Sequence, residues 1–153
     1  MTIMNVLKVQ IVRNVNSLIE EYSKLMGLLQ VSNLSEETQK LYKSKLLAIG
    51  YIMSVLLSFK QLSPKINKLL HKSLTDERCT SAEANEFNFR HVNHMRYVVN
   101  ELRGLLVNTI LNTDDINQLL ETNSITEVEK IYENIKGRFV GNKQLKSFIR
   151  RYQ

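Results

Sequence analysis

Three histidines and one cysteine are the side chains of this 153-residue chain best suited to bind a metal or attack a substrate. His91 and His94 lie three residues apart, so a helix would place both on one face. No CxxC, HExxH or second histidine pair completes a zinc site around them. Cys79 lies in a polar stretch that offers no base oriented by a third group. The sequence therefore predicts no metal site, no cofactor and no catalytic residue.

The five glycines do not form a phosphate-binding loop. None of them belongs to a GxGxxG or GxxxxGK[ST] motif, whose glycines let the main chain approach a phosphate closely. Nucleotide-dependent chemistry through those motifs is excluded. We therefore expect a protein that is not an enzyme.

Lysine and arginine provide a second kind of chemistry, the binding of anions. The net charge is +6, and residues 134–153 carry six bases and no acid. Residues 38–75 carry seven lysines and no acid, whereas residues 76–133 carry five bases and eleven acids. The residues that we expect to bind an anion or a nucleic acid are basic residues of these first two segments: Lys136, Arg138, Lys143, Lys146, Arg150, Arg151, Lys65, Lys68 and Lys72.

Two interpretations of this charge pattern stay open. The basic C-terminal segment could form a patch for a nucleic acid, an acidic protein or a membrane surface. Alternatively, the acidic segment 76–133 could neutralise it within the fold. Aromatic residues interleave with these bases, and exposed aromatic rings stack on nucleic-acid bases. However, Phe139 and Phe148 share a helical spacing with aliphatic residues, which places both in the core and leaves Arg150 and Arg151 exposed.

The run Arg90–His94 resembles one enzyme family. It is similar to the HEPN ribonucleases, small helical domains marked by an arginine and a histidine a few residues later. Here three residues separate Arg90 from His94, fewer than in that family. The resemblance implies that His94 would help to activate a ribose 2′-hydroxyl and that Arg90 would stabilise the phosphate. Both residues fall within a segment, about 81–112, that is predicted to be helical.

A long amphipathic helix is predicted at the N-terminus, over about 4–31. Its apolar residues recur every seven positions, with others at spacings of three or four, which is typical of a helix and not of a strand. This stripe could be a seam with a helix of another chain or the inner face of a helix in its own bundle. The residues that we expect to meet a partner helix are Met4, Leu7, Ile11, Leu18 and Leu25.

Capping residues and apolar periodicity predict further helices. They begin after Ser35, Ser63, Thr80, Thr113 and Ser124, residues that accept hydrogen bonds from the first turn of a helix. The predicted ranges are about 36–62, 64–74, 81–112, a short helix from 113, 124–139 and 142–152. Residues 1–153 are thus expected to form an all-α, single-domain bundle of six or seven helices without a sheet, built around 36–62 and 81–112. Residues 134–153 form its basic C-terminal segment.

The sequence gives no strong membrane or export signal. The longest uncharged run, between Lys45 and Lys60, has fourteen residues, and a membrane span needs roughly 20. Lys8 and Arg13 interrupt the apolar residues at the N-terminus, unlike a signal peptide. The absence of acids before Glu20 also fits a mitochondrial presequence. We expect an intracellular, soluble protein, cytoplasmic or nuclear, without a membrane span.

These observations favour a non-enzymatic helical interaction protein, such as an adaptor. It would bind another macromolecule, or a second copy of itself, through its apolar helix faces. One alternative is a nucleic-acid-binding regulatory protein that uses the basic C-terminal segment. A second alternative is a HEPN-like helical ribonuclease that uses Arg90 and His94.

Overall fold

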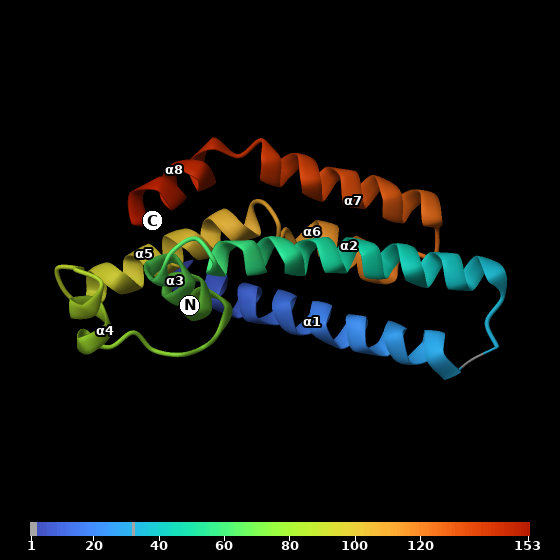
Figure 1. The fold of residues 1–153 in the computed structure, drawn as a ribbon, viewed down its shortest axis with the longest axis horizontal. Helices are drawn as coiled ribbons and strands as arrows, with labels where there is room; N and C mark the ends of the chain where they lie inside the picture. The colour runs from blue at the N-terminus through green and yellow to red at the C-terminus, as the bar shows by residue number, and fades with distance from the viewer. Residues whose placement is uncertain (1–2, 32) are drawn as a thin grey trace.

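The computed structural model describes residues 3–31 and 33–153, and this part of the chain is helical without strands (Figure 1). The all-helical architecture is confirmed. The helices are α1 (Ile3–Val31), α2 (Glu36–Lys60), α3 (Pro64–Leu74), α4 (Ser81–Glu86), α5 (Val92–Val107), α6 (Thr113–Glu121), α7 (Ile125–Val140) and α8 (Lys143–Tyr152).

The described residues thus form eight helices, and the expected number of six or seven was too low because the predicted helix 81–112 is interrupted. Asn88 adopts a φ of 63°, in the left-handed region that asparagine tolerates better than most residues. The chain then turns so that the Phe89 amide donates to the Ala84 carbonyl at 2.8 Å. The Phe89 ring is buried, and its burial offsets the cost of the break.

The helices pack in three tiers (Figure 1). Helix α1 lies on one side, antiparallel to α2, and also contacts α3, α5 and α6. Helices α7 and α8 lie on the other side, where α7 packs on α2 and α6, and α8 packs on α3 and α5. The second tier, formed by α2, α3, α5 and α6, therefore has neighbours on both sides.

Most caps lie where the sequence predicts them. Ser35, Ser63 and Ser124 accept hydrogen bonds from the first turns of α2, α3 and α7, and Thr80 forms a capping box with Glu83. The cap of α6 was predicted one residue too late, because Asn112 accepts from the Asp115 amide and is the cap.

The apolar stripe of α1 faces the core of its own chain. Ile11, Leu18 and Leu25 are almost fully buried there. Helix α2 carries the centre of the core in its second half, including Ile49 and Ile52. Within the described residues, α2 alone is long and apolar enough to cross a membrane, and a core helix of a water-soluble bundle passes the same test, so this is weak evidence of a span.

Gly50 does not mark a close helix contact. A Cβ built at this position would have no atom within 4 Å outside its own helix, and α2 continues through it to Lys60.

Candidate anion-binding cleft

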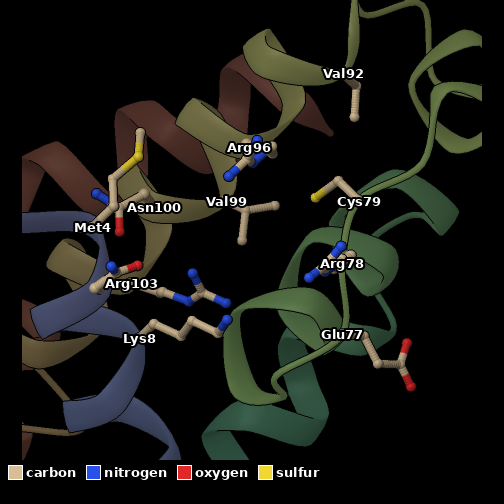
Figure 2. Close-up of a pocket in the computed structure, with 11 residues that line it drawn as sticks. Met4, Lys8, Glu77, Arg78, Cys79, Val92, Arg96, Val99, Asn100 and Arg103 are labelled. Carbon is tan, nitrogen blue, oxygen red and sulfur yellow. The ribbon is translucent and has the colours of Figure 1, made fainter. Parts of the chain in front are cut away.

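A cleft of about 540 Å³ opens between the start of α1, the connection 75–80 and one side of α5 (Figure 2). Its lining consists of cationic, polar and a few apolar side chains: Met4, Asn5, Lys8, Glu77, Arg78, Cys79, Val92, Arg96, Val99, Asn100 and Arg103. Four of the described lining residues are cationic and one is acidic. The cleft therefore brings positive charge together from three parts of the chain.

Helix α5 supplies one wall of the cleft through its periodicity. Arg96, Val99, Asn100 and Arg103 stand at i, i+3, i+4 and i+7, so they share one face. Val99 and Arg103 of this face are largely buried, as is Leu102 on the adjoining face. Packing of α5 on the core thus fixes the direction in which the two arginines project.

Arg103 anchors this wall to the end of α3. Its side chain is only 8% exposed, and its Nε–H and Nη2–H groups donate to the carbonyl oxygens of Ser73, Lys72 and Thr75 at 3.1, 2.9 and 3.3 Å. These carbonyls belong to the last turn of α3 and to its C-cap, where the helix itself has no N–H groups left to bind them. Burial lowers the pKa of Arg103, yet a guanidinium stays protonated in proteins. The cleft therefore has a permanent positive charge at its floor.

The connection 75–80 is fixed by an ion-pair cluster around Lys72. The Lys72 ammonium is buried and donates to the Arg78 carbonyl at 2.7 Å, and it lies 3.0 Å from Glu83 Oε1 and 3.5 Å from Glu77 Oε2. Lys68 lies 2.8 Å from the other oxygen of Glu83. Four separate contacts thus hold the main chain that presents Arg78 to the cleft.

The acid in the cleft lining is directed elsewhere. Glu77 points away from the cleft (Figure 2), toward His71 Nε2 at 3.4 Å and toward Lys72. The hydrogen bond with His71 lowers the pKa of Glu77. Because its negative charge is engaged on the outer side, it neutralises the cleft only weakly.

Two of the cations remain available to a ligand. Arg78 and Arg96 are exposed, and no hydrogen bond or ion pair within residues 3–31 and 33–153 uses either guanidinium. Lys8 forms an ion pair with Asp76, whose side chain is largely exposed. A guanidinium presents parallel N–H donors to a phosphate or carboxylate, so Arg78 and Arg96 suit such a group.

Cys79 contributes a thiol group to the lining of the cleft. Its sulfur projects into the space between the arginines (Figure 2). Burial raises the pKa of the Cys79 thiol, so the reactive thiolate is rarer than for a free cysteine. Cys79 is therefore better suited as a labelling site that reports on the cleft than as a catalytic nucleophile.

Asn100 contributes an acceptor to the same wall. Its side-chain oxygen is buried and accepts no hydrogen bond in the described part of the chain. An unpaired buried acceptor costs about 1–3 kcal/mol.

The basic residues proposed from the sequence are dispersed by the fold. Lys68 and Lys72 belong to the ion-pair cluster with Glu83, and Lys72 is buried. Lys65 lies 4.8 Å above the ring of Phe89. None of these three lines the cleft.

The C-terminal bases divide into engaged and exposed groups. Arg138 lies 3.0 Å from Asp115, Arg151 lies 2.8 Å from Glu101, and Lys136 lies 4.9 Å above the ring of Tyr132. The remaining three, Lys143, Lys146 and Arg150, are exposed on α8 and form no ion pair within the described ranges. Acids of the segment 76–133 thus neutralise Arg138 and Arg151, whereas the bases of α8 that are left without an ion pair keep the binding interpretation as a prediction.

The predicted partner-helix residues lie mainly in the core. Ile11, Leu18 and Leu25 are buried, and Leu7 packs near Gly104 of α5. Met4 is 38% exposed and lines the cleft. In this fold the stripe is covered by the chain's own helices.

The arginine–histidine pair is not on one helix. Arg90 precedes α5, and His91 caps the helix by accepting from the His94 amide at 3.3 Å. The His94 ring stands edge-on to Phe89, 5.3 Å between centroids, and its Nδ1 is buried without a hydrogen-bond partner in the described structure. The expected helical placement of the pair is therefore wrong, because the chain breaks at Asn88.

Four cations of the cleft were not predicted from the sequence: Lys8, Arg78, Arg96 and Arg103. Three of them lie in the segment with a net negative charge, which concealed them. The spacing of Arg96 and Arg103 was the available signal, since it puts two arginines on one helix face. Within the described residues no group of three or more histidine, cysteine or acidic side chains could hold a metal ion.

Comparison with known proteins adds no relative from which a role could be transferred. No protein-family model, no curated protein and no solved structure matches this chain.

Proposed function

We propose that this protein works by binding, and that its cleft holds a ligand with phosphate groups. The observation that carries the proposal is the convergence of Lys8, Arg78, Arg96 and Arg103 on one cleft. Like charges repel, so their convergence costs free energy that an anion would recover. This is the binding role expected from the sequence, at a site that the sequence did not indicate.

Phosphate is favoured over a single carboxylate by the arrangement of the donors. Arg96 projects from α5 and Arg78 from the connection across the cleft, so they approach a ligand from different sides (Figure 2). A phosphate group has oxygens in several directions and can accept from both, whereas a carboxylate has two oxygens in one plane. Support for binding over catalysis comes from Cys79, whose raised pKa makes it a weak nucleophile.

The test is titration calorimetry with inorganic pyrophosphate at low salt. Arg78→Gln and Arg96→Gln should each weaken binding about tenfold or more, because a charge-assisted hydrogen bond contributes roughly 1.5–3 kcal/mol. Both side chains are exposed, so neither change should alter the circular dichroism spectrum. The matched control is Lys130→Gln, which removes an exposed charge from α7.

Binding that is equally strong in the wild type and the Arg96→Gln variant would contradict the proposal. So would an equal loss on changing Lys130, which would indicate attraction by net charge alone. A wild type that binds no pyrophosphate at low salt would also overturn it.

A further inference from the structure

We propose that the ligand is a single-stranded nucleic acid, which runs from the cleft across the outer face of α5 to the basic helix α8. This inference rests on the proposed function and names the class of its ligand. Three features carry it: a second hollow beside α8, an exposed tyrosine between the two hollows, and unpaired cations on α8.

The second hollow lies on the other side of α5. It has a volume of about 390 Å³ and is lined by residues of α5 and α8: Glu101, Leu105, Lys143, Gln144, Ser147 and Arg151. On α5, Asn100 faces the cleft and Glu101, the next residue, faces this hollow. The two hollows therefore flank one helix, whose diameter with side chains is about 10–12 Å.

Tyr97 stands between the two hollows. It follows Arg96 of the cleft by one residue and precedes Glu101 of the second hollow by four. Its side chain is 62% exposed, and its ring has no aromatic or cation partner in the described structure. A large exposed aromatic ring among cations is the arrangement on which unpaired bases stack.

Helix α8 supplies the charges beyond Tyr97. Lys143, Ser147 and Arg150 stand at i, i+4 and i+7 on its outer face, opposite the buried Leu145 and Phe148. Glu101, the acid of the second hollow, is already bound by Arg151 at 2.8 Å. The outer face of α8 thus offers cations to a phosphate backbone.

A nucleic-acid strand fits this surface better than the alternatives. An acidic peptide supplies negative charge but no flat ring for Tyr97. A duplex keeps its bases stacked inside, out of reach of Tyr97.

The experiment measures fluorescence anisotropy with a labelled single strand of roughly 12 mixed-sequence nucleotides, the matching duplex and a poly-glutamate peptide, over a salt series. We expect the single strand to bind most tightly. Tyr97→Ala should weaken its binding about tenfold, whereas Tyr97→Phe and the exposed control Leu57→Ala should change it less than twofold.

The variant Lys143→Glu with Arg150→Glu tests the far end of the path. It should make the log–log salt slope shallower by roughly 1.4, since each phosphate contact with a single strand contributes about 0.7. Pyrophosphate binding to the cleft, measured by calorimetry, should stay unchanged in this variant and in Tyr97→Ala.

The outcomes separate the two proposals. One outcome is that pyrophosphate binding depends on Arg96 while the affinity for the single strand is the same in the wild type, Tyr97→Ala and the α8 variant. That result overturns the inference and leaves the proposed function standing. If the wild type binds no pyrophosphate, and single-strand binding does not depend on Arg78 or Arg96, both are overturned. Equal binding of the duplex or of poly-glutamate, insensitive to Tyr97→Ala, also overturns the inference.

Discussion

The buried Lys72 and the partly exposed Glu83 form an ion pair, 3.0 Å from Nζ to Oε1, that closes the chain around the connection 75–80. Lys72 also donates to the carbonyl of Arg78 within that connection. The pair therefore joins the end of α3 to the start of α4 and fixes the main chain that carries Arg78 and Cys79. The charge of Glu83 is required for this arrangement.

The first prediction concerns acid stability. Burial would raise the pKa of Glu83, but hydrogen bonds from Lys68, Lys72 and Thr80 outweigh it and lower the pKa from 4.5 to about 2. A folded-state pKa below the unfolded value stabilises the protein fully above about pH 4.5, and this contribution is lost as the pH falls toward 2. Urea denaturation at several pH values should show this loss.

Two variants identify the carboxylate responsible. Glu83→Gln should be less stable than the wild type at neutral pH and lose less stability on acidification. The control Glu129→Gln removes an exposed carboxylate of α7 and should leave the pH dependence of the wild type intact. Equal pH profiles for the wild type and Glu83→Gln would contradict the role of this ion pair.

Arg103 gives the second prediction. Arg103→Met should lower the free energy of unfolding by about 2–4 kcal/mol, because three carbonyl oxygens at the end of α3 lose their donor. Arg103→Lys keeps the charge but not the forked donors, and it should recover only part of the loss. Chemical denaturation measures the free energy of unfolding of both variants. A lysine variant as stable as the wild type would show that the charge alone matters and would contradict the role of the forked donors.

A glycine within α2 and the glycine that caps the end of α7 give a third, paired prediction. Gly50→Ala should stabilise the protein by roughly 1 kcal/mol, since the helix continues through Gly50 and its Cβ would meet no atom within 4 Å. Gly141→Ala should gain less or destabilise, because a Cβ there would lie 3.1 Å from the Gly137 carbonyl oxygen. A melting temperature that rises equally in both variants would argue against this packing.

The apolar stripe of α1 gives a fourth prediction. Ile11→Ala should cost about 2–5 kcal/mol of stability, as expected for a fully buried side chain. Val31→Ala, at a side chain that is 83% exposed, should change stability by less than about 0.5 kcal/mol. If the stripe instead met another chain, Ile11→Ala would alter the molecular mass in sedimentation more than the stability of each chain.

The helices could be predicted because their signals are local. Ser63 before Pro64 and the pairing of Thr80 with Glu83 act within one helical turn, and the structure has caps at both places. The break at Asn88 depends on burying Phe89 against other helices, so the local pattern ran on through it. Tertiary packing decided that element.

The cleft could not be predicted because its charges are far apart in the sequence. Lys8 lies near the start of α1 and Arg103 lies on α5, so only the packing of these two helices brings them into one cleft. Arg78 joins them through the connection fixed by Lys72. The net charges of sequence segments were also a poor guide to the cleft. The acidic residues near Arg78 form ion pairs with lysines of another segment, so they do not neutralise Arg78. What mattered was which bases remain unpaired after folding.

The measurement that tests the cleft most directly is the rate at which Cys79, the chain's one cysteine, reacts with the neutral reagent iodoacetamide as pyrophosphate is added. The thiol lies among the arginines, so a bound anion should shield it. We expect the rate to fall severalfold and to saturate in the wild type, and to stay constant in a variant with Arg78→Glu and Arg96→Glu. A wild-type rate that does not change with pyrophosphate would contradict an anion site in this cleft. An equal fall of the rate in the wild type and in the variant would contradict it as well.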